Sequence, residues 1–229
     1  MVAPTPQPES TALANEAKNL PLDAIQRRRT LAFRLANLVR KNPNDEAARL
    51  GLMFAAFHTG DRDKGIQELH WLVSRASALD TAVLTNIAPS LVMIGELERA
   101  ASVLALLAER PEHAHLEGAK PVQDVLYALL CGRTDLAYDL ASLSEQGQLI
   151  LRRLEREGLF VPLRLAGYAA AHTLGKIACD LDIRINVPER HPGALLHIIY
   201  RANTDGVYLD NMLSEFDRLW DKYCTQNNS

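Results

Sequence analysis

Cysteine is scarce in this 229-residue sequence, and no long apolar run is present. The three cysteines, Cys131, Cys179 and Cys224, are odd in number and widely spaced, so they fit neither a disulfide framework nor a CxxC zinc pattern. No apolar stretch approaches the roughly 18 residues that a membrane span needs. The opening MVAPTPQPES lacks the basic start and apolar core of a signal peptide. We therefore expect a cytoplasmic protein without a membrane span.

Recognisable catalytic signatures are missing as well. The sequence contains no GxSxG, P-loop, HExxH or GxGxxG string. His172 and Cys179 stand seven residues apart on a predicted helix, which separates them by about 10 Å along its axis. That distance exceeds the hydrogen-bond reach that a Cys–His pair needs. We predict that the protein is not an enzyme and that it needs no cofactor.

Charge of one sign is not in large excess. The 25 Lys and Arg residues against 28 Asp and Glu residues leave a formal net charge of −3. This near balance argues against a surface built as a whole for nucleic acid, although local basic patches are compatible with it. Apolar residues make up 48% of the chain and charged residues 23%, a composition that excludes wholesale disorder and predicts a globular protein.

Three regions are expected along the chain. Residues 1–20 carry three prolines and few large apolar residues, so we predict a disordered, proline-rich tail. The pattern over residues 21–178 is helical almost throughout. Residues 179–229 form a third region with two strand-like runs and an amphipathic helix, at residues 182–187, 195–201 and 207–220.

Glycines interrupt the helical region at nearly constant intervals of 35 and 37 residues, at Gly60, Gly95 and Gly132. Each glycine ends one apolar helix and begins another, so it is expected to supply the positive φ of a tight turn. A small residue follows each glycine by five positions, at Gly65, Ala100 and Ala137. A small residue there lets the second helix cross the first closely.

These features resemble the tetratricopeptide repeat (TPR), a helix pair of about 34 residues with small residues where its helices cross. The clearest unit runs from Leu84 to Pro111, with others over residues 47–77 and 122–143. The first unit has Gly65 where the family usually places alanine. The resemblance implies a mostly α fold, a short TPR-like antiparallel helix-pair array, here with a small α/β C-terminal appendage of two strands and a helix. The alternative is a plain antiparallel helical bundle in which the spacing is coincidental.

A TPR-like array implies a concave groove that recognises a peptide or helix of another protein. We therefore predict a protein–protein interaction module, acting as an adaptor, a scaffold subunit or a chaperone-like holder of a partner segment. The residues expected to line the groove come from the first helix of each repeat: His58, Asn86, Ser90, Met93, Gln123 and Tyr127. A homodimer through the C-terminal strands or final helix is also considered, and an enzyme without a recognisable motif stays open as another class.

A basic stretch, QRRRTLAFRLANLVRKNP at residues 26–43, contains six positive charges and no acid. Arg27, Arg34 and Lys41 recur every seven residues and therefore share one helix face, with Arg28 beside them. This basic patch could bind an acidic protein, a phosphate backbone or an anionic membrane. A charged face is the default for a surface helix, so we favour the interpretation of a solvated outer helix at the end of the array.

Residues 135–160 support an alternative function in nucleic-acid binding. They resemble the helix-turn-helix core of winged-helix regulators, in which LA…L precedes a recognition helix ending LxxLExxGL. The resemblance places Arg152, Arg153 and Arg156 on or near the recognition helix. The sequence departs from the winged-helix pattern at two places. Gly147 stands where the recognition helix normally carries a packed aliphatic residue. The segment that follows is apolar and helical, where a winged-helix protein has a β-hairpin wing.

A cluster of possible metal ligands lies in the stretch Glu112-His113-Ala114-His115, with Glu117 close by. Two imidazoles and nearby carboxylates could bind zinc or nickel. Alternate histidines on a loop bind weakly without a third fixed ligand, so we interpret this stretch as a loop between repeats and predict no metal site.

Overall fold

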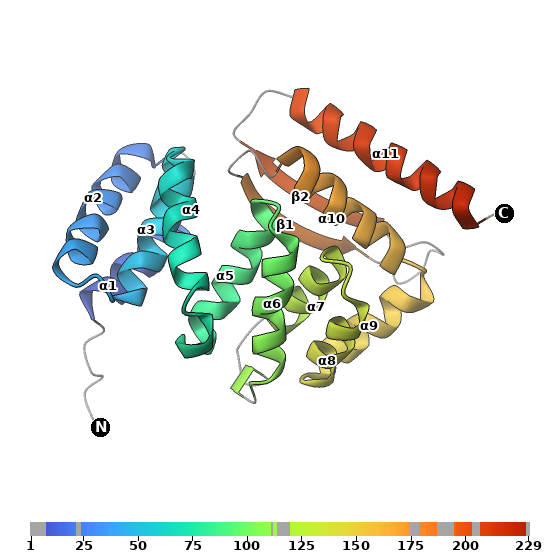
Figure 1. The fold of residues 1–229 in the computed structure, drawn as a ribbon, viewed down its shortest axis with the longest axis horizontal. Coiled ribbons are helices and arrows are strands. Elements are labelled where there is room, and N and C mark those ends of the chain that lie inside the picture. The colour runs from blue at the N-terminus through green and yellow to red at the C-terminus, as the bar shows by residue number, and fades with distance from the viewer. Residues whose placement is uncertain are drawn as a thin grey trace. The chain divides into compact units, whose positions relative to one another are not determined.

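The computed structural model describes residues 8–21, 24–110, 112–113, 120–174, 179–186, 195–202 and 207–227 (Figure 1). The chain divides into two compact units, Met1–Leu79 and Asp80–Ser229. This division falls inside residues 21–178, which the sequence predicts as one helical domain. No helix among the described residues is long and apolar enough to cross a membrane.

The first unit contains α1 (Glu9–Asn19), α2 (Ile25–Lys41), α3 (Glu46–Thr59), α4 (Arg62–Val73) and the 3-10 turn η1 (Ala76–Ala78). The second contains α5 (Thr81–Met93), α6 (Leu97–Ala108), α7 (Lys120–Leu130), α8 (Thr134–Ser142), α9 (Glu145–Arg156), α10 (Phe160–Leu174), β1 (Cys179–Asn186), β2 (Leu195–Ala202) and α11 (Val207–Asn227). Within each unit, consecutive helices fold back on one another as antiparallel pairs, notably α3 with α4, α5 with α6, and α7 with α8.

The predicted glycine turns are confirmed. Gly60, Gly95 and Gly132 adopt φ values of 81°, 82° and 74°, a left-handed conformation that costs glycine little. After each glycine, the next residue donates its backbone N–H to a carbonyl five positions earlier, as from Asp61 to Ala56 at 2.9 Å. Gly158 forms a fourth turn of this kind between α9 and α10, with a φ of 65°. The local sequence LxxLExxGL, which suggests a recognition helix, is therefore also the sequence of a helix C-cap.

The predicted disordered tail is wrong for residues 9–19, which form helix α1. Leu13 and Ala17 of this helix are buried in one apolar cluster with residues of α2 and α3. Gly51 makes the close approach of α1 to α3 possible, because a Cβ at Gly51 would lie 2.8 Å from the Cα of Ala14. The low content of large apolar residues in this stretch therefore reflects a tight helix crossing and not disorder.

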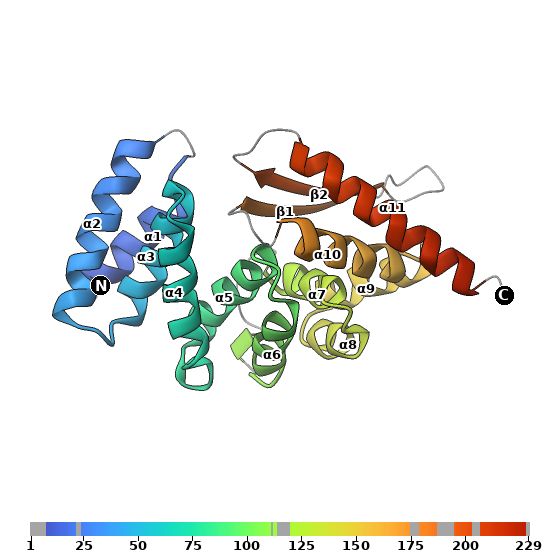
Figure 2. The same ribbon diagram turned by 45° about the horizontal axis from the view of Figure 1, so that its top comes forward.

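Helix α7 lies at the centre of the second unit. It packs against α5, α6, α8, α9 and α10, and its residues from Asp124 to Leu130 are all buried. Helix α10 crosses α7 at Gly167, where an added Cβ would lie 2.8 Å from the carbonyl carbon of Leu130. Figure 2 shows α11 running alongside α10, which it contacts. The absence of a side chain at Gly167 thus allows α10 to pack closely on α7.

The predicted fold class is wrong in its C-terminal part. Every regular element whose side chains the structure describes is a helix, so an α/β appendage with a sheet core is not supported. β1 and β2 are described by their backbone only, as an antiparallel pair in which Ile183 lies opposite Ile198. Two strands alone bury too little apolar surface to form a unit of their own. Helix α11 instead packs on α10 and belongs to the helical second unit.

Candidate functional site

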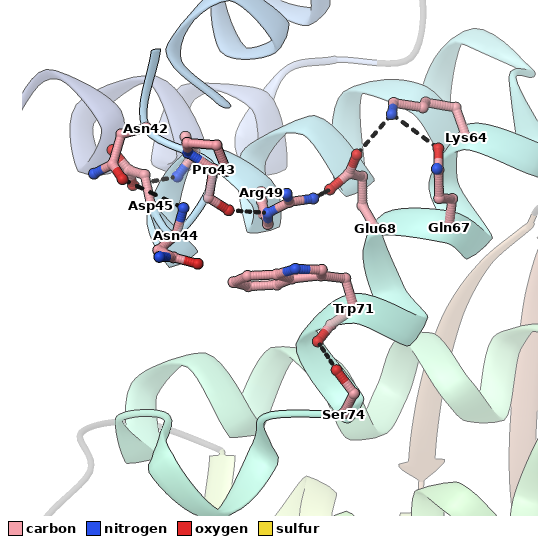
Figure 3. A network of polar contacts seen from close by, with 11 residues as sticks. Asn42, Pro43, Asn44, Asp45, Arg49, Lys64, Gln67, Glu68, Trp71 and Ser74 are labelled. Atoms are coloured by element: carbon pink, nitrogen blue, oxygen red, sulfur yellow. Dashed lines mark hydrogen bonds and ion pairs between the residues drawn. The ribbon is translucent and has the colours of Figure 1, made fainter. Parts of the chain in front are cut away.

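The contact between α3 and α4 includes a polar cluster around a buried carboxylate (Figure 3). The side chain of Glu68 is only 1% exposed, and its two carboxylate oxygens pair with Arg49 at 2.5 Å and Lys64 at 2.7 Å. Desolvating a carboxylate is costly unless it is paired and hydrogen-bonded. The two cations supply that compensation, and the Arg49–Glu68 pair joins α3 to α4 at this point.

Helix geometry and the preceding loop position these side chains. Lys64 and Glu68 are four residues apart and therefore share one face of α4. On α3, the Nε of Arg49 donates a hydrogen bond to the backbone carbonyl of Pro43 at 2.8 Å. Asp45 caps the start of α3 by accepting from the Ala48 amide at 2.9 Å. The loop before α3 thus orients the arginine that reaches across to α4, as Figure 3 shows.

Trp71 gives this cluster an aromatic surface. Its ring lies against two guanidinium groups, with ring-centroid distances of 4.1 Å to Arg49 and 4.5 Å to Arg75. Trp71 is half-buried, whereas Arg75 is exposed. Cation–π contact of this kind restrains a long arginine side chain while its N–H groups stay available to an anionic partner. We name Arg49, Lys64, Glu68, Trp71 and Arg75 the Arg–Trp cluster.

The Arg–Trp cluster has the chemistry of a binding surface for carboxylates. Three cations and one anion leave it with two surplus positive charges. No acidic side chain among the described residues forms an ion pair with Arg75. A guanidinium can hold a carboxylate through two parallel hydrogen bonds, and tryptophan and arginine are enriched among the residues that dominate protein interfaces.

Sequence reasoning missed the Arg–Trp cluster. Lys64, Glu68, Trp71 and Arg75 are spaced by four, three and four residues, which is the spacing of one helix face. That pattern could have indicated a polar face centred on one of only two tryptophans. The contribution of Arg49 depends on how α3 packs against α4, and no local pattern contains that information.

The predicted groove residues lie in different environments. Ser90 and Tyr127 are only 3% and 5% exposed, so the expectation that they line an open groove is corrected. The hydroxyl of Ser90 donates to the carbonyl of Asn86 within α5, and Tyr127 is enclosed because neighbouring helices surround α7. Asn86 and Met93 share a half-buried face of α5, and Gln123 is exposed near the start of α7. His58 belongs to the first unit and lies half-buried beside Phe54. A role in partner binding stays a prediction for Asn86, Met93, Gln123 and His58.

The predicted basic patch is divided by the packing of α1. Arg28 is 1% exposed and donates to the backbone carbonyls of Leu20 and His58, so its place in a surface patch is corrected. Arg27 and Arg34 are exposed and pair with acids of α1. Lys41 is exposed at the end of α2. The face that the heptad spacing defines is therefore occupied in part by the chain itself.

The arginines of the nucleic-acid alternative lie on α9. Arg152 and Arg156 are exposed and Arg153 is half-buried. Gly147 packs tightly, because a Cβ there would lie 3.1 Å from the Cα of Ala141 in α8. Helix α10 follows α9 directly after the Gly158 turn. The described segment after α9 is thus helical where a winged-helix protein has its hairpin.

The possible metal ligands are only partly described. His113 is fully buried, and its Nε2 lies 2.8 Å from a carboxylate oxygen of Asp124 on α7. His115 and Glu117 lie outside the described residues. Within the described part of the chain, no three His, Cys, Asp or Glu side chains form a group that could hold a metal ion.

Cys131, at the end of α7, should resist alkylation in the folded protein. Burial raises the pKa of its thiol from about 9 to about 12, so at pH 8 the thiol stays protonated and unreactive. The stability contributed by this neutral thiol is complete below pH 9 and is lost as the pH rises toward 12. Peptide mass spectrometry after iodoacetamide treatment should show half-buried Cys224 modified before Cys131. Equal labelling rates for Cys131 in native buffer and in urea would contradict this expectation.

Comparison with known proteins identified no relatives. The sequence matches no protein-family model, no curated protein and no solved structure.

Proposed function

We propose that this protein is a non-enzymatic interaction module that holds an acidic segment of a partner protein. The observation that carries this proposal is the Arg–Trp cluster, in which Arg75 lies exposed against Trp71 with no acidic partner among the described residues. The cluster offers apolar area, two surplus positive charges and a guanidinium with available N–H donors. This combination suits a segment that carries carboxylates next to an apolar side chain.

The helix pairs support the same function. Turns at Gly60, Gly95 and Gly132, together with small residues at the crossings, underlie the TPR-like resemblance, and such arrays act through recognition of peptides or helices. The half-exposed residues Asn86 and Met93 are candidates for a second contact of the same module. As parts of this proposal we retain the cytoplasmic location and the roles of adaptor, scaffold subunit or chaperone-like holder.

Charge reversal at Arg75 should abolish partner capture without unfolding the protein. Because Arg75 is exposed, Arg75→Glu removes a guanidinium and adds a repelling carboxylate at little cost in stability. The experiment is affinity capture from the lysate of the native host, with nuclease-treated and untreated halves. We expect a discrete protein in both halves with the wild-type chain, and at least a tenfold loss of it with Arg75→Glu, while the circular dichroism is unchanged.

Arg152→Glu is the matched control, because Arg152 is an exposed arginine of the other unit. It should leave the captured protein unchanged. Captured material that disappears with nuclease and with Arg152→Glu, but not with Arg75→Glu, would reject the proposal in favour of nucleic-acid binding through α9. Equal capture by wild type and Arg75→Glu in both halves would also contradict it.

A further inference from the structure

Helices α1 and α2 are joined by two ion pairs with matching periods. Glu9 pairs with Arg34 at 2.8 Å, and Glu16 pairs with Arg27 at 2.5 Å. The two acids are seven residues apart, and so are the two arginines. The acid nearer the start of α1, Glu9, pairs with the arginine farther along α2, Arg34, so the two helices run antiparallel. The heptad of basic residues on α2 therefore matches an acidic helix that carries carboxylates at the same interval.

The apolar contact between these helices is equally specific. Leu13 and Ala17 of α1 lie in one cluster with Leu31 and Leu35 of α2 and with small and apolar residues of α3. Gly51 of α3 lets α1 approach closely, because a Cβ at Gly51 would lie 2.8 Å from the Cα of Ala14 on α1. The surface of α2 and α3 thus selects a helix with one leucine, adjacent small residues and flanking acids.

Helix α1 is short, and its first turn is weakly held. It has 11 residues, too few for a stable isolated helix, and its N-cap residue, Pro8, makes no side-chain capping hydrogen bond. Its buried positions are Ser10, Leu13, Ala14 and Ala17, of which one is large and apolar. The side chains of the Glu9–Arg34 pair are 62% and 46% exposed, so this pair contributes little. Undocking of α1 is therefore expected to cost less free energy than unfolding of the whole first unit.

From these contacts we infer that α2 and α3 form a docking surface for an acidic helix of a partner protein, and that α1 is the chain's own exchangeable occupant. The partner helix carries carboxylates seven residues apart, with a leucine and small residues on the face between them. Binding requires α1 to leave, so α1 lowers the apparent affinity of the surface. This surface is separate from the Arg–Trp cluster, and the inference does not depend on the proposed function.

The probe is a fluorescent peptide of residues 8–21, which reproduces α1. The receptor is the full chain with Leu13→Asp and Ala17→Asp, which prevent its own α1 from docking. We expect saturable binding by fluorescence anisotropy to this variant, and binding at least tenfold weaker to the wild-type chain, where α1 competes. A peptide with Glu9→Lys and Glu16→Lys loses both exposed pairs and places lysines against Arg27 and Arg34, so it should bind at least about threefold more weakly. Adding Arg27→Glu and Arg34→Glu to the receptor should restore its binding.

A folded receptor variant that binds neither peptide would overturn the inference, as would equal affinity for both peptides. Native-state hydrogen exchange on the wild-type chain supplies a test that does not depend on the variant. We expect the α1 amides to exchange at least tenfold faster than the protected amides of α3. Exchange of both helices at one rate, that of global unfolding, would show that α1 is a permanent part of the fold.

Discussion

Replacing Gly167 by alanine should lower the free energy of unfolding of the Asp80–Ser229 unit by about 3 kcal/mol. A Cβ at this position would overlap the carbonyl group of Leu130 on the central helix α7. The obstacle is backbone, so no rotamer change relieves it, and α10 must move away from α7. Alanine is the better helix former by about 1 kcal/mol, which offsets only part of this cost. Urea unfolding followed by circular dichroism measures the difference.

Gly158→Ala is the matched control for this prediction. Gly158 lies in the same unit and has a φ of 65°, but a Cβ there would meet no atom within 4 Å. Its replacement should therefore cost only the strain of a left-handed alanine, about 1 kcal/mol. If Gly167→Ala proves no more destabilising than Gly158→Ala, the close crossing of α10 over α7 is wrong.

The second large effect is expected at Glu68. Replacing it by leucine leaves Arg49, whose side chain is only 13% exposed, without its anionic partner. Removing one member of a buried pair leaves an uncompensated charge, so Glu68→Leu should destabilise the first unit by about 3 kcal/mol. Thermal unfolding of the full chain, followed by circular dichroism and by tryptophan fluorescence, measures this loss.

The double variant Arg49→Met and Glu68→Leu tests the cause of that loss. Replacing both charges by apolar side chains removes the unpaired cation, so most of the lost stability should return. As a control, Arg99→Ala removes an exposed arginine that pairs with Glu96, and it should change stability by less than about 0.5 kcal/mol. A double variant no more stable than Glu68→Leu would mean that the carboxylate itself, and not the charge balance, holds α3 to α4.

Local physical chemistry explains the features that were predictable. The turns at Gly60, Gly95 and Gly132 follow from a conformational preference of one residue type, and the helices between them follow from a short-range repeat of apolar side chains. The burial of Ala100 and Ala137 five residues after a glycine is part of the same local pattern. Each of these predictions needs only residues that lie close together in the chain.

The errors arose where the outcome depends on which helix covers which face. Ser90 and Tyr127 stand on first helices as expected, but neighbouring helices enclose α7, and Tyr127 with it. Arg28 follows the same charge pattern as Arg27, yet it turns inward to two backbone carbonyls. The Arg–Trp cluster, the most informative surface of the first unit, joins Arg49 to residues of α4 across a helix pair.

The sequence by itself determined the helical character of the chain, the positions of its main glycine turns and the heptad of basic residues on α2. Those properties come from backbone preferences and from the period of the α-helix, which act over a few residues. Only the tertiary structure decided that α1 is a helix, that it pairs with Arg27 and Arg34, and that α10 covers α7 at Gly167. A small residue marks a close approach, but the helix that approaches is chosen by contacts between distant parts of the chain.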